Sequence, residues 1–188
     1  MAVEVLALLQ RDFPDVELIM IGPDEGDGSL AETRQQAMEL VVSGSVRFTG
    51  VVPKSEVPSS LAQGTVFLNT TDVDNAPVSL LEAMACGLPV VSTNVGGISD
   101  LVEDGRNALL VPPRNPRAMA ARIADILRDP DLASKLSRNG RQSANMHSWA
   151  RTLPRWERVL CAAVTQTGAA DRATGSSFEQ LPEGADGA

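Results

Sequence analysis

Five short apolar segments alternate with segments of helical pattern over the first 113 residues of the chain. The apolar segments are VELIMIG, SVRFTG, TVFLNT, PVVSTN and NALLVPP, and Gly, Pro or polar residues bound each of them. Short apolar runs of this kind are typical of buried strands. Strands that alternate with helices form βαβ units, in which the strands run parallel. The sequence therefore predicts an α/β fold with a parallel sheet flanked by helices.

The chain begins with a helical pattern and not with a strand. Val3, Leu6 and Leu9 recur at helical spacing ahead of the first apolar segment. In a doubly wound sheet the first strand is central, and the second and fourth strands are its neighbours. We therefore expect a sheet that lacks its first strand, in which strands 16–22 and 65–70 either pair with each other or leave a gap. A gap would expose unpaired strand edges.

After the fifth strand the pattern is helical only. Residues 116–128 form a strongly amphipathic segment, and the residues that follow favour two or three more helices. From residue 165 onward the chain is rich in Gly, Ala and acidic residues and poor in large apolar ones, which is typical of disorder. We expect one domain with a helical C-terminal extension over residues 1–164 and a disordered tail over residues 165–188.

The stretch DVDNAPVSLLEAMACGLPVVSTNVGG, residues 72–97, carries the features that point to chemistry. Asp74 lies in a loop before a short apolar helix, and Glu82 lies within that helix. The N-terminus of a helix suits a phosphate, because its first N–H groups lack internal partners and its dipole end is positive. Carboxylates accept hydrogen bonds from hydroxyl groups. This pattern favours an anion that carries hydroxyl groups, such as a nucleotide-sugar.

Composition opposes several other functions. The net charge is −8, which would repel a phosphate backbone, and aromatic residues make up 3% with no Tyr, so stacking on nucleic acid is not expected. The two cysteines, Cys86 and Cys161, have no metal-ligand or disulfide spacing, which favours a reducing compartment. No apolar run is long enough to span a membrane, and the N-terminus has no basic leader region. We expect a cytoplasmic location, with attachment to the inner membrane face as a further option.

FTGVV, residues 72–113 and the helix that follows resemble the retaining glycosyltransferases of the two-domain GT-B fold, often called glycosyltransferase group 1. The resemblance covers roughly residues 1–160 and only the second, donor-binding domain of that family. It implies a Rossmann-like half of a GT-B fold. It also implies a hexosyltransferase-type activity that transfers a sugar from a UDP- or GDP-sugar with retention of the anomeric configuration.

The same resemblance assigns roles to the acidic pair. The family carries two acids separated by seven residues, and Asp74 and Glu82 have that spacing, with Asp in place of the first Glu. It assigns Glu82 to the ribose of the nucleotide and Asp74 to the donor sugar near the reacting centre. The alternatives are a glutamate that faces water and an aspartate that only stabilises a turn.

Further positions follow from the family's pattern. The loop residue Asn75 replaces the first residue of the family's Gly-Phe-Gly, and the N–H groups after Pro77 would meet the diphosphate or the sugar hydroxyls. Gly22 ends a strand where the family brings its backbone close to the nucleotide, and the segment of Val51 and Val52 would meet the base. The residues expected to bind substrate are Gly22, Val52, Asn75, Val78, Ser79, Leu80 and Glu82.

The chain departs from the family in two ways. The Arg-x4-Lys pattern that neutralises the donor diphosphate does not occur before residue 16, and the acceptor-binding domain is absent. The expected partners are a nucleotide-diphosphate sugar, an unknown acceptor (glycan, lipid or small molecule) and a separate N-terminal acceptor domain, with no metal, cofactor or nucleic acid. The alternative function is a non-catalytic nucleotide-sugar-binding module or a truncated remnant, in which the chain by itself is inactive.

Overall fold

The computed structural model describes residues 1–174, and the chain divides into two compact units, Met1–Asn145 and Met146–Ala188. The second unit contains α8 (Trp149–Thr174), which has Pro154 in its interior. This helix includes the first ten residues of the segment expected to be disordered, and the rest of that segment, 175–188, lies outside the described residues. Within residues 1–174, no helix combines the length and the apolar character needed to cross a bilayer.

The first unit contains two parallel sheets. In one sheet β1 (Leu18–Met20) pairs with β2 (Val46–Phe48). In the other, β4 (Val90–Thr93) lies between β3 (Phe67–Asn69) and β5 (Leu109–Val111). The predicted parallel α/β architecture is therefore confirmed. Of the two alternatives for the predicted strands 16–22 and 65–70, the structure has the gap, because β1 and β3 do not pair.

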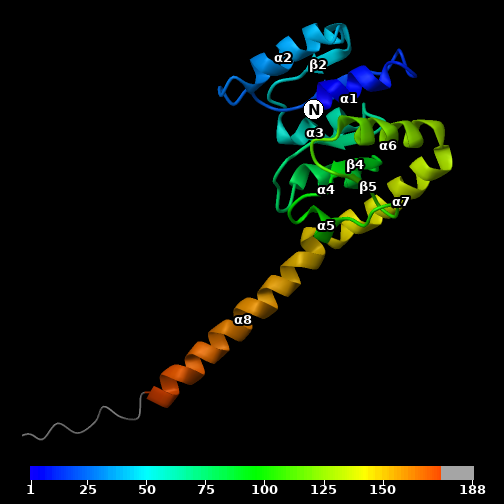
Figure 1. Cartoon of the computed structure of the whole chain (residues 1–188). Coiled ribbons are helices and arrows are strands. Elements are labelled where there is room, and N and C mark those ends of the chain that lie inside the picture. Colours follow the sequence, from blue (N-terminus) through cyan, green and yellow to red (C-terminus); the bar gives the residue numbers. More distant parts are fainter. Residues whose placement is uncertain (175–188) are drawn as a thin grey trace, which may run out of the picture. The chain divides into compact units, whose positions relative to one another are not determined.

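Helices connect and cover these strands, as Figure 1 shows. The longer ones are α1 (Ala2–Leu9), α2 (Ser29–Glu39), α4 (Val78–Cys86), α6 (Pro116–Arg128) and α7 (Pro130–Met146). The short ones are α3 (Val57–Leu61), α5 (Ile98–Leu101) and the 3-10 turns η1 (Ser43–Ser45) and η2 (Lys54–Glu56). The first turn of α6 is fixed by the Asn115 side chain, which accepts a 2.9 Å hydrogen bond from the Ala118 N–H.

Apolar side chains pack on both faces of the larger sheet. On one face Val91 packs with Val5 of α1 and Met119 of α6, and α1 and α6 lie side by side in Figure 1. On the other face Val90 packs with Leu80 of α4. All four residues of β4 are buried, as expected for a central parallel strand covered by helices on both sides.

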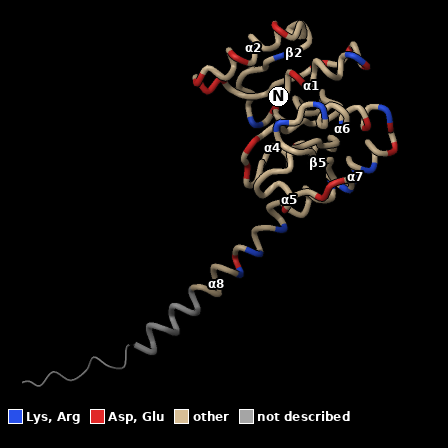
Figure 2. The backbone as a smooth tube through the Cα atoms, in the orientation of Figure 1, with Lys and Arg blue, Asp and Glu red and all other residues tan. Residues whose placement is uncertain are grey.

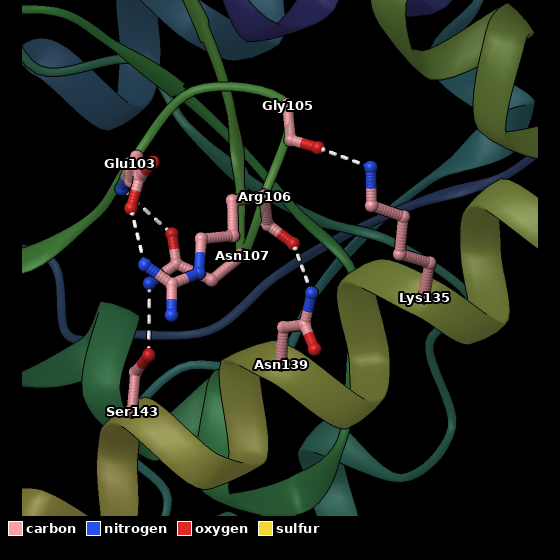
Figure 3. Close-up of polar contacts among 7 residues, drawn as sticks. All are labelled: Glu103, Gly105, Arg106, Asn107, Lys135, Asn139 and Ser143. Atoms are coloured by element: carbon pink, nitrogen blue, oxygen red, sulfur yellow. Dashed lines mark hydrogen bonds and ion pairs between the residues drawn. The ribbon is translucent and has the colours of Figure 1, made fainter.

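A polar network joins the connection between α5 and β5 to α7 (Figure 3). The buried Asn107 side chain accepts a 2.7 Å hydrogen bond from the Glu103 N–H and donates a 2.8 Å bond to the Ser143 hydroxyl. Lys135 and Asn139 donate to the backbone carbonyls of Gly105 and Arg106 at 2.9 and 2.8 Å. These bonds satisfy the polar groups of a loop that would otherwise be loosely held.

Candidate functional site

The loops that follow the carboxyl ends of β3 and β4 form the candidate site. Open parallel sheets bind ligands outside this edge. The loop after β3 contains Asp74 and leads into α4, whereas β4 leads through Gly96 and Gly97 into α5. The two loops touch, because the Gly97 N–H donates a 3.1 Å hydrogen bond to the Asp74 carbonyl oxygen.

Glycine is required at both positions after β4. A Cβ atom on Gly96 would overlap the Asp74 carbonyl oxygen, and one on Gly97 would overlap the Asn75 carbonyl oxygen. Gly96 also has a φ of 52°, which disfavours other residues. The sequence pattern predicts these glycines at the opening of a helix, but their contact with the acidic loop arises only from the fold.

Two further contacts hold the start of the acidic loop. The Thr93 hydroxyl donates a 2.6 Å hydrogen bond to the Thr71 carbonyl oxygen, and Arg114 forms a 2.9 Å ion pair with Asp72. Neither contact was predicted, since the partners lie 22 and 42 residues apart and no local pattern links them. Together they fix the path of the chain just after β3.

Glu82 lies on α4, one turn after Ser79, and its side chain is half-buried. Both residues line a cavity of about 900 Å³ that also extends along β1 and β3. Within residues 1–163, the Glu82 carboxylate has no hydrogen-bond or ion-pair partner. Its oxygens can therefore accept hydrogen bonds from a ligand in the cavity.

Asp74 is half-buried and stabilises its own loop. Its Oδ1 atom accepts a 3.1 Å hydrogen bond from the Ala76 N–H, which is the turn arrangement that Asp commonly forms. In the part of the chain that the structure describes, the Oδ2 atom makes no hydrogen bond or ion pair. One oxygen thus supports the turn while the other can accept a bond from a ligand.

The N-terminus of α4 differs by one residue from the expectation. Pro77 is the N-cap, and Val78 is the first helical residue. The Leu80 N–H, expected to face a ligand, instead donates a 3.2 Å bond to the Pro77 carbonyl oxygen, and the Leu80 side chain is fully buried. The N–H groups of Val78 and Ser79 have no backbone acceptor within the described residues, so these two donors remain at the helix start.

The other expected residues lie outside the lining of the 900 Å³ cavity. Asn75 is exposed in the acidic loop. Gly22 follows β1 with a φ of 151°, and its N–H donates a 3.2 Å hydrogen bond to the Gly50 carbonyl oxygen. Val52 is half-buried after β2, whereas Val51 is exposed. Gly22 and Val52 thus lie in the connections that follow β1 and β2, whereas Asp74 and Glu82 lie in the loop and helix that follow β3.

Charged groups elsewhere in the described residues do not form a competing site. No cluster of three or more His, Cys, Asp or Glu side chains could hold a metal ion in the described part of the chain. Acidic and basic residues are interspersed along the tube of the first unit in Figure 2, without a long basic stretch in that view. The helix start with the acidic pair therefore remains the best-formed candidate for ligand binding.

A parallel sheet with an open helix start and acidic side chains after its strands is typical of α/β domains that bind phosphate-containing ligands. The chain belongs to the glycosyl transferases group 1, whose family model matches residues 1–143. This membership confirms the family that the sequence resemblance indicated.

Three relatives illustrate the similarity. The D-inositol 3-phosphate glycosyltransferase of Jonesia denitrificans is 32% identical over 181 residues, which cover 88% of this chain and 41% of that protein. The GDP-mannose-dependent alpha-(1-6)-phosphatidylinositol monomannoside mannosyltransferase of Mycolicibacterium smegmatis is 31% identical over 156 residues, covering 79% and 40%. The crystal structure of Anabaena HepE in complex with UDP superposes with a TM-score of 0.77 and 25% identity, covering 86% and 45%. The chain thus spans less than half the length of these proteins.

Proposed function

We propose that this chain is the donor-binding domain of a retaining glycosyltransferase that uses a UDP- or GDP-sugar. The similar mannosyltransferase is named for its dependence on GDP-mannose, and the similar Anabaena structure contains UDP. A nucleotide-diphosphate sugar is therefore the donor class that the relatives favour. The acceptor, which is a glycan, a lipid or a small molecule, binds a separate N-terminal domain. We place the protein in the cytoplasm. Peripheral attachment to the inner membrane face is the alternative location.

The observation that carries this proposal is the unpartnered Glu82 carboxylate in the cavity beside Ser79. An ionised carboxylate can accept one hydrogen bond from each hydroxyl of a ribose diol. The N–H groups of Val78 and Ser79 would then meet the diphosphate at the positive end of the α4 dipole. Asp74 would accept a hydroxyl of the donor sugar through the Oδ2 atom, while Oδ1 keeps its bond to Ala76.

In the reaction, the bond between the sugar anomeric carbon and the phosphate oxygen breaks, and the nucleotide diphosphate leaves. The acceptor oxygen forms the new bond on the same face of the sugar, so the anomeric configuration is retained. The leaving phosphate takes the acceptor proton, and no protein nucleophile is required. This chain holds the leaving group, whereas transfer also needs an oriented acceptor and a site closed to water.

Gly22 and Val52 have the remaining roles in the proposal. Both follow the carboxyl ends of strands of the β1–β2 sheet, as the acidic loop follows the carboxyl end of β3. Their backbone would approach the nucleotide and its base, and Asn75 would extend the contacts with the sugar. The exposed position of Asn75 suits such a contact.

Isothermal titration calorimetry tests the proposal with UDP, GDP, UDP-glucose and GDP-mannose as titrants. We expect one nucleotide series to bind, and Glu82→Gln to weaken that binding about tenfold or more, because bonds to a charged acceptor contribute about 1.5–3 kcal/mol. Glu32→Gln on α2 is the matched control, since Glu32 is exposed and does not line the cavity that contains Glu82. Absence of binding by all four ligands would rule the proposal out.

An assay of donor hydrolysis and sugar transfer then distinguishes the transferase function from the alternative function, a nucleotide-sugar-binding module without catalysis. The chain spans about two fifths of the relatives' length. Binding with turnover supports the transferase, and binding without turnover in the presence of an added acceptor domain supports the module.

A further inference from the structure

The charges around the candidate donor site are unbalanced. Asp15, Glu17 and Glu82 line the cavity of about 900 Å³, and no Lys or Arg residue lines it. A nucleotide diphosphate is itself an anion, so acidic side chains nearby oppose its binding unless a cation offsets the repulsion. Such a cation must therefore come from outside the lining of the cavity.

Arg114 is the one basic residue in the loops at the carboxyl edge of the larger sheet. The loops that follow β3, β4 and β5 cover residues 70–77, 94–97 and 112–115, and they contain no other Lys or Arg. The first of these loops carries Asp74 and leads into α4. Within these three loops, Arg114 is thus the only side chain that could offset the charge of an anionic ligand.

The ion pair of Arg114 with Asp72 spans the carboxyl end of β4. Each residue lies three positions after the last residue of its strand, Asp72 after β3 and Arg114 after β5. Because β4 lies between these two strands, their ends are about 10 Å apart, which is two strand spacings. The Arg114 side chain therefore reaches back across the sheet edge to the acidic loop, where its Nε atom lies 2.9 Å from Asp72 Oδ2.

Most of the hydrogen-bonding capacity of this guanidinium group is free. Its Nε–H donates to Asp72 Oδ2, whereas Nη1 and Nη2 have no hydrogen-bond or ion-pair partner in the described part of the chain. The Arg114 side chain is 82% exposed, so a ligand can approach it. Nη1 and Nη2 carry N–H donors in one plane, which is the geometry that binds phosphate oxygens in pairs.

The backbone of Arg114 indicates that local stability does not explain an arginine at this position. Its φ is 55°, in the left-handed region that glycine and asparagine adopt more readily. For an arginine this conformation destabilises the fold by more than an exposed ion pair typically stabilises it. Strained residues of this kind cluster at ligand-binding sites. A contact with a ligand accounts for the arginine where the ion pair does not.

We propose that Arg114 binds the diphosphate of the nucleotide-sugar. Nη1 and Nη2 donate to phosphate oxygens while Nε keeps its bond to Asp72, and the N–H groups of Val78 and Ser79 hold the same diphosphate at the start of α4. The inference rests on the proposed donor function and adds the residue that supplies the positive charge. Negative charge grows on the leaving diphosphate as the sugar–phosphate bond breaks, so the same contact also favours transfer.

Titration calorimetry of the full chain with UDP and GDP tests the charge of Arg114. We expect Arg114→Gln to weaken binding about tenfold. Arg114→Lys should weaken it less, because Lys keeps the charge but not the planar pair of donors. The affinity of Arg114→Gln should also depend less steeply on NaCl concentration, since one ionic contact is lost. Equal losses for Lys and Gln, or an unchanged salt dependence, would overturn the proposal.

Arg106→Gln is the matched control. Arg106 is also an exposed arginine in an ion pair, 2.7 Å from Glu103 (Figure 3), but it precedes the amino end of β5, whereas Arg114 follows the carboxyl end. Its replacement removes the same charge from the opposite edge of the sheet, so we expect an unchanged affinity. An equal loss in Arg106→Gln and Arg114→Gln would show an effect of net charge alone and would contradict the proposal.

Two further variants separate ligand binding from structural support. Asp72→Asn removes the ion pair and keeps the cation, so the affinity should stay nearly unchanged. Arg114→Asn relieves the left-handed backbone and removes the cation, so the affinity should fall about tenfold while the melting temperature does not fall. A lower melting temperature together with the lower affinity would assign Arg114 a structural role and would overturn the proposal.

The same titrations distinguish failure of this inference from failure of the donor site. A protein that binds neither UDP nor GDP would overturn the donor site itself and, with it, the role of Arg114. Binding that is equally tight in the parent protein and in Arg114→Gln would overturn only the role of Arg114. The assignments of Glu82 and of the start of α4 would then stand.

Discussion

The Gly97 N–H donates a hydrogen bond of 3.1 Å to the Asp74 carbonyl oxygen, and this bond ties the acidic loop to the turn after β4. The loop carries one of the two candidate ligand carboxylates, so its position depends on a glycine in the next strand–helix connection. A side chain on Gly97 would overlap the Asn75 carbonyl oxygen. The local geometry of the site is therefore set by the contact between the β3–α4 loop and the β4–α5 turn, and not by either connection alone.

Replacement of Gly97 by Ala should move the acidic loop away from α5. We expect a loss of about 1–3 kcal/mol in the free energy of unfolding, because an added methyl group in a tight contact forces a backbone shift. Urea denaturation measures this loss. Gly44→Ala is the matched control, since a Cβ atom there meets no atom within 4 Å. An unchanged midpoint for both variants would show that the loop adapts without strain.

The variant Asp74→Asn should show whether Asp74 contacts the sugar or the nucleotide of the donor. The Asn side chain keeps an oxygen for the Ala76 N–H, so the turn persists, but its second position becomes a donor. We expect the affinity for the nucleotide-sugar to fall about tenfold while the affinity for the nucleotide alone stays unchanged. Titration calorimetry with each ligand measures both values.

Asp72→Asn is the control for that variant, because the exposed Asp72 carboxylate pairs with Arg114 and not with the helix start. An exposed ion pair contributes only about 0–1 kcal/mol, so little change in either affinity is expected. Equal losses for the nucleotide and the nucleotide-sugar in Asp74→Asn would place Asp74 away from the sugar.

The variant Asn107→Ala should destabilise the first unit. Its side chain makes two hydrogen bonds at a buried position, to the Glu103 N–H and the Ser143 hydroxyl. Their loss leaves polar groups without partners, which costs about 1–3 kcal/mol. Asn139→Ala, which removes a single bond to the Arg106 carbonyl oxygen, should cost less. The two unfolding free energies, measured in urea, should differ in that order, and the reverse order would contradict the role of Asn107.

Replacement of Val41 by Asn should stabilise the protein. Val41 has a φ of 59° and is 88% exposed, so a β-branched residue occupies the left-handed region without the benefit of burial. Left-handed backbone costs an ordinary L-residue roughly 1–2 kcal/mol, and Asn adopts it more readily. We expect a melting temperature several degrees higher by calorimetry. Val42→Asn is the opposite control, because Val42 is buried and its replacement should destabilise the fold.

Local sequence patterns predicted most of the elements. The alternation of apolar runs and helices gave the parallel strands and their order along the chain, because strand and helix periodicities are short-range properties. The start of α4 was predicted to within one residue. The prediction made Pro77 the first helical residue, whereas in the structure Pro77 is the N-cap. The acidic pair was found because both residues lie within one loop–helix segment.

Contacts between distant segments could not be predicted in this way. The bonds of Thr93 to Thr71 and of Gly97 to Asp74 depend on how two connections meet across the sheet edge. The partner of the Leu80 N–H depends on the exact turn at Pro77, which also follows from packing. These details determine which donors and carboxylate oxygens remain available to a ligand.

The sequence by itself determined a parallel α/β fold, the family and the acidic pair of Asp74 and Glu82, since each rests on residues that are close in the chain. Only the tertiary structure decided that β1 and β3 stay apart. The packing of α1 is likewise a tertiary result, because its Val5 and Leu9 pack in the cluster of α6, whereas Val3 and Leu6 pack in the cluster of α2 and β1. One helix thus packs against both sheets, which holds them in one unit although their edges do not pair.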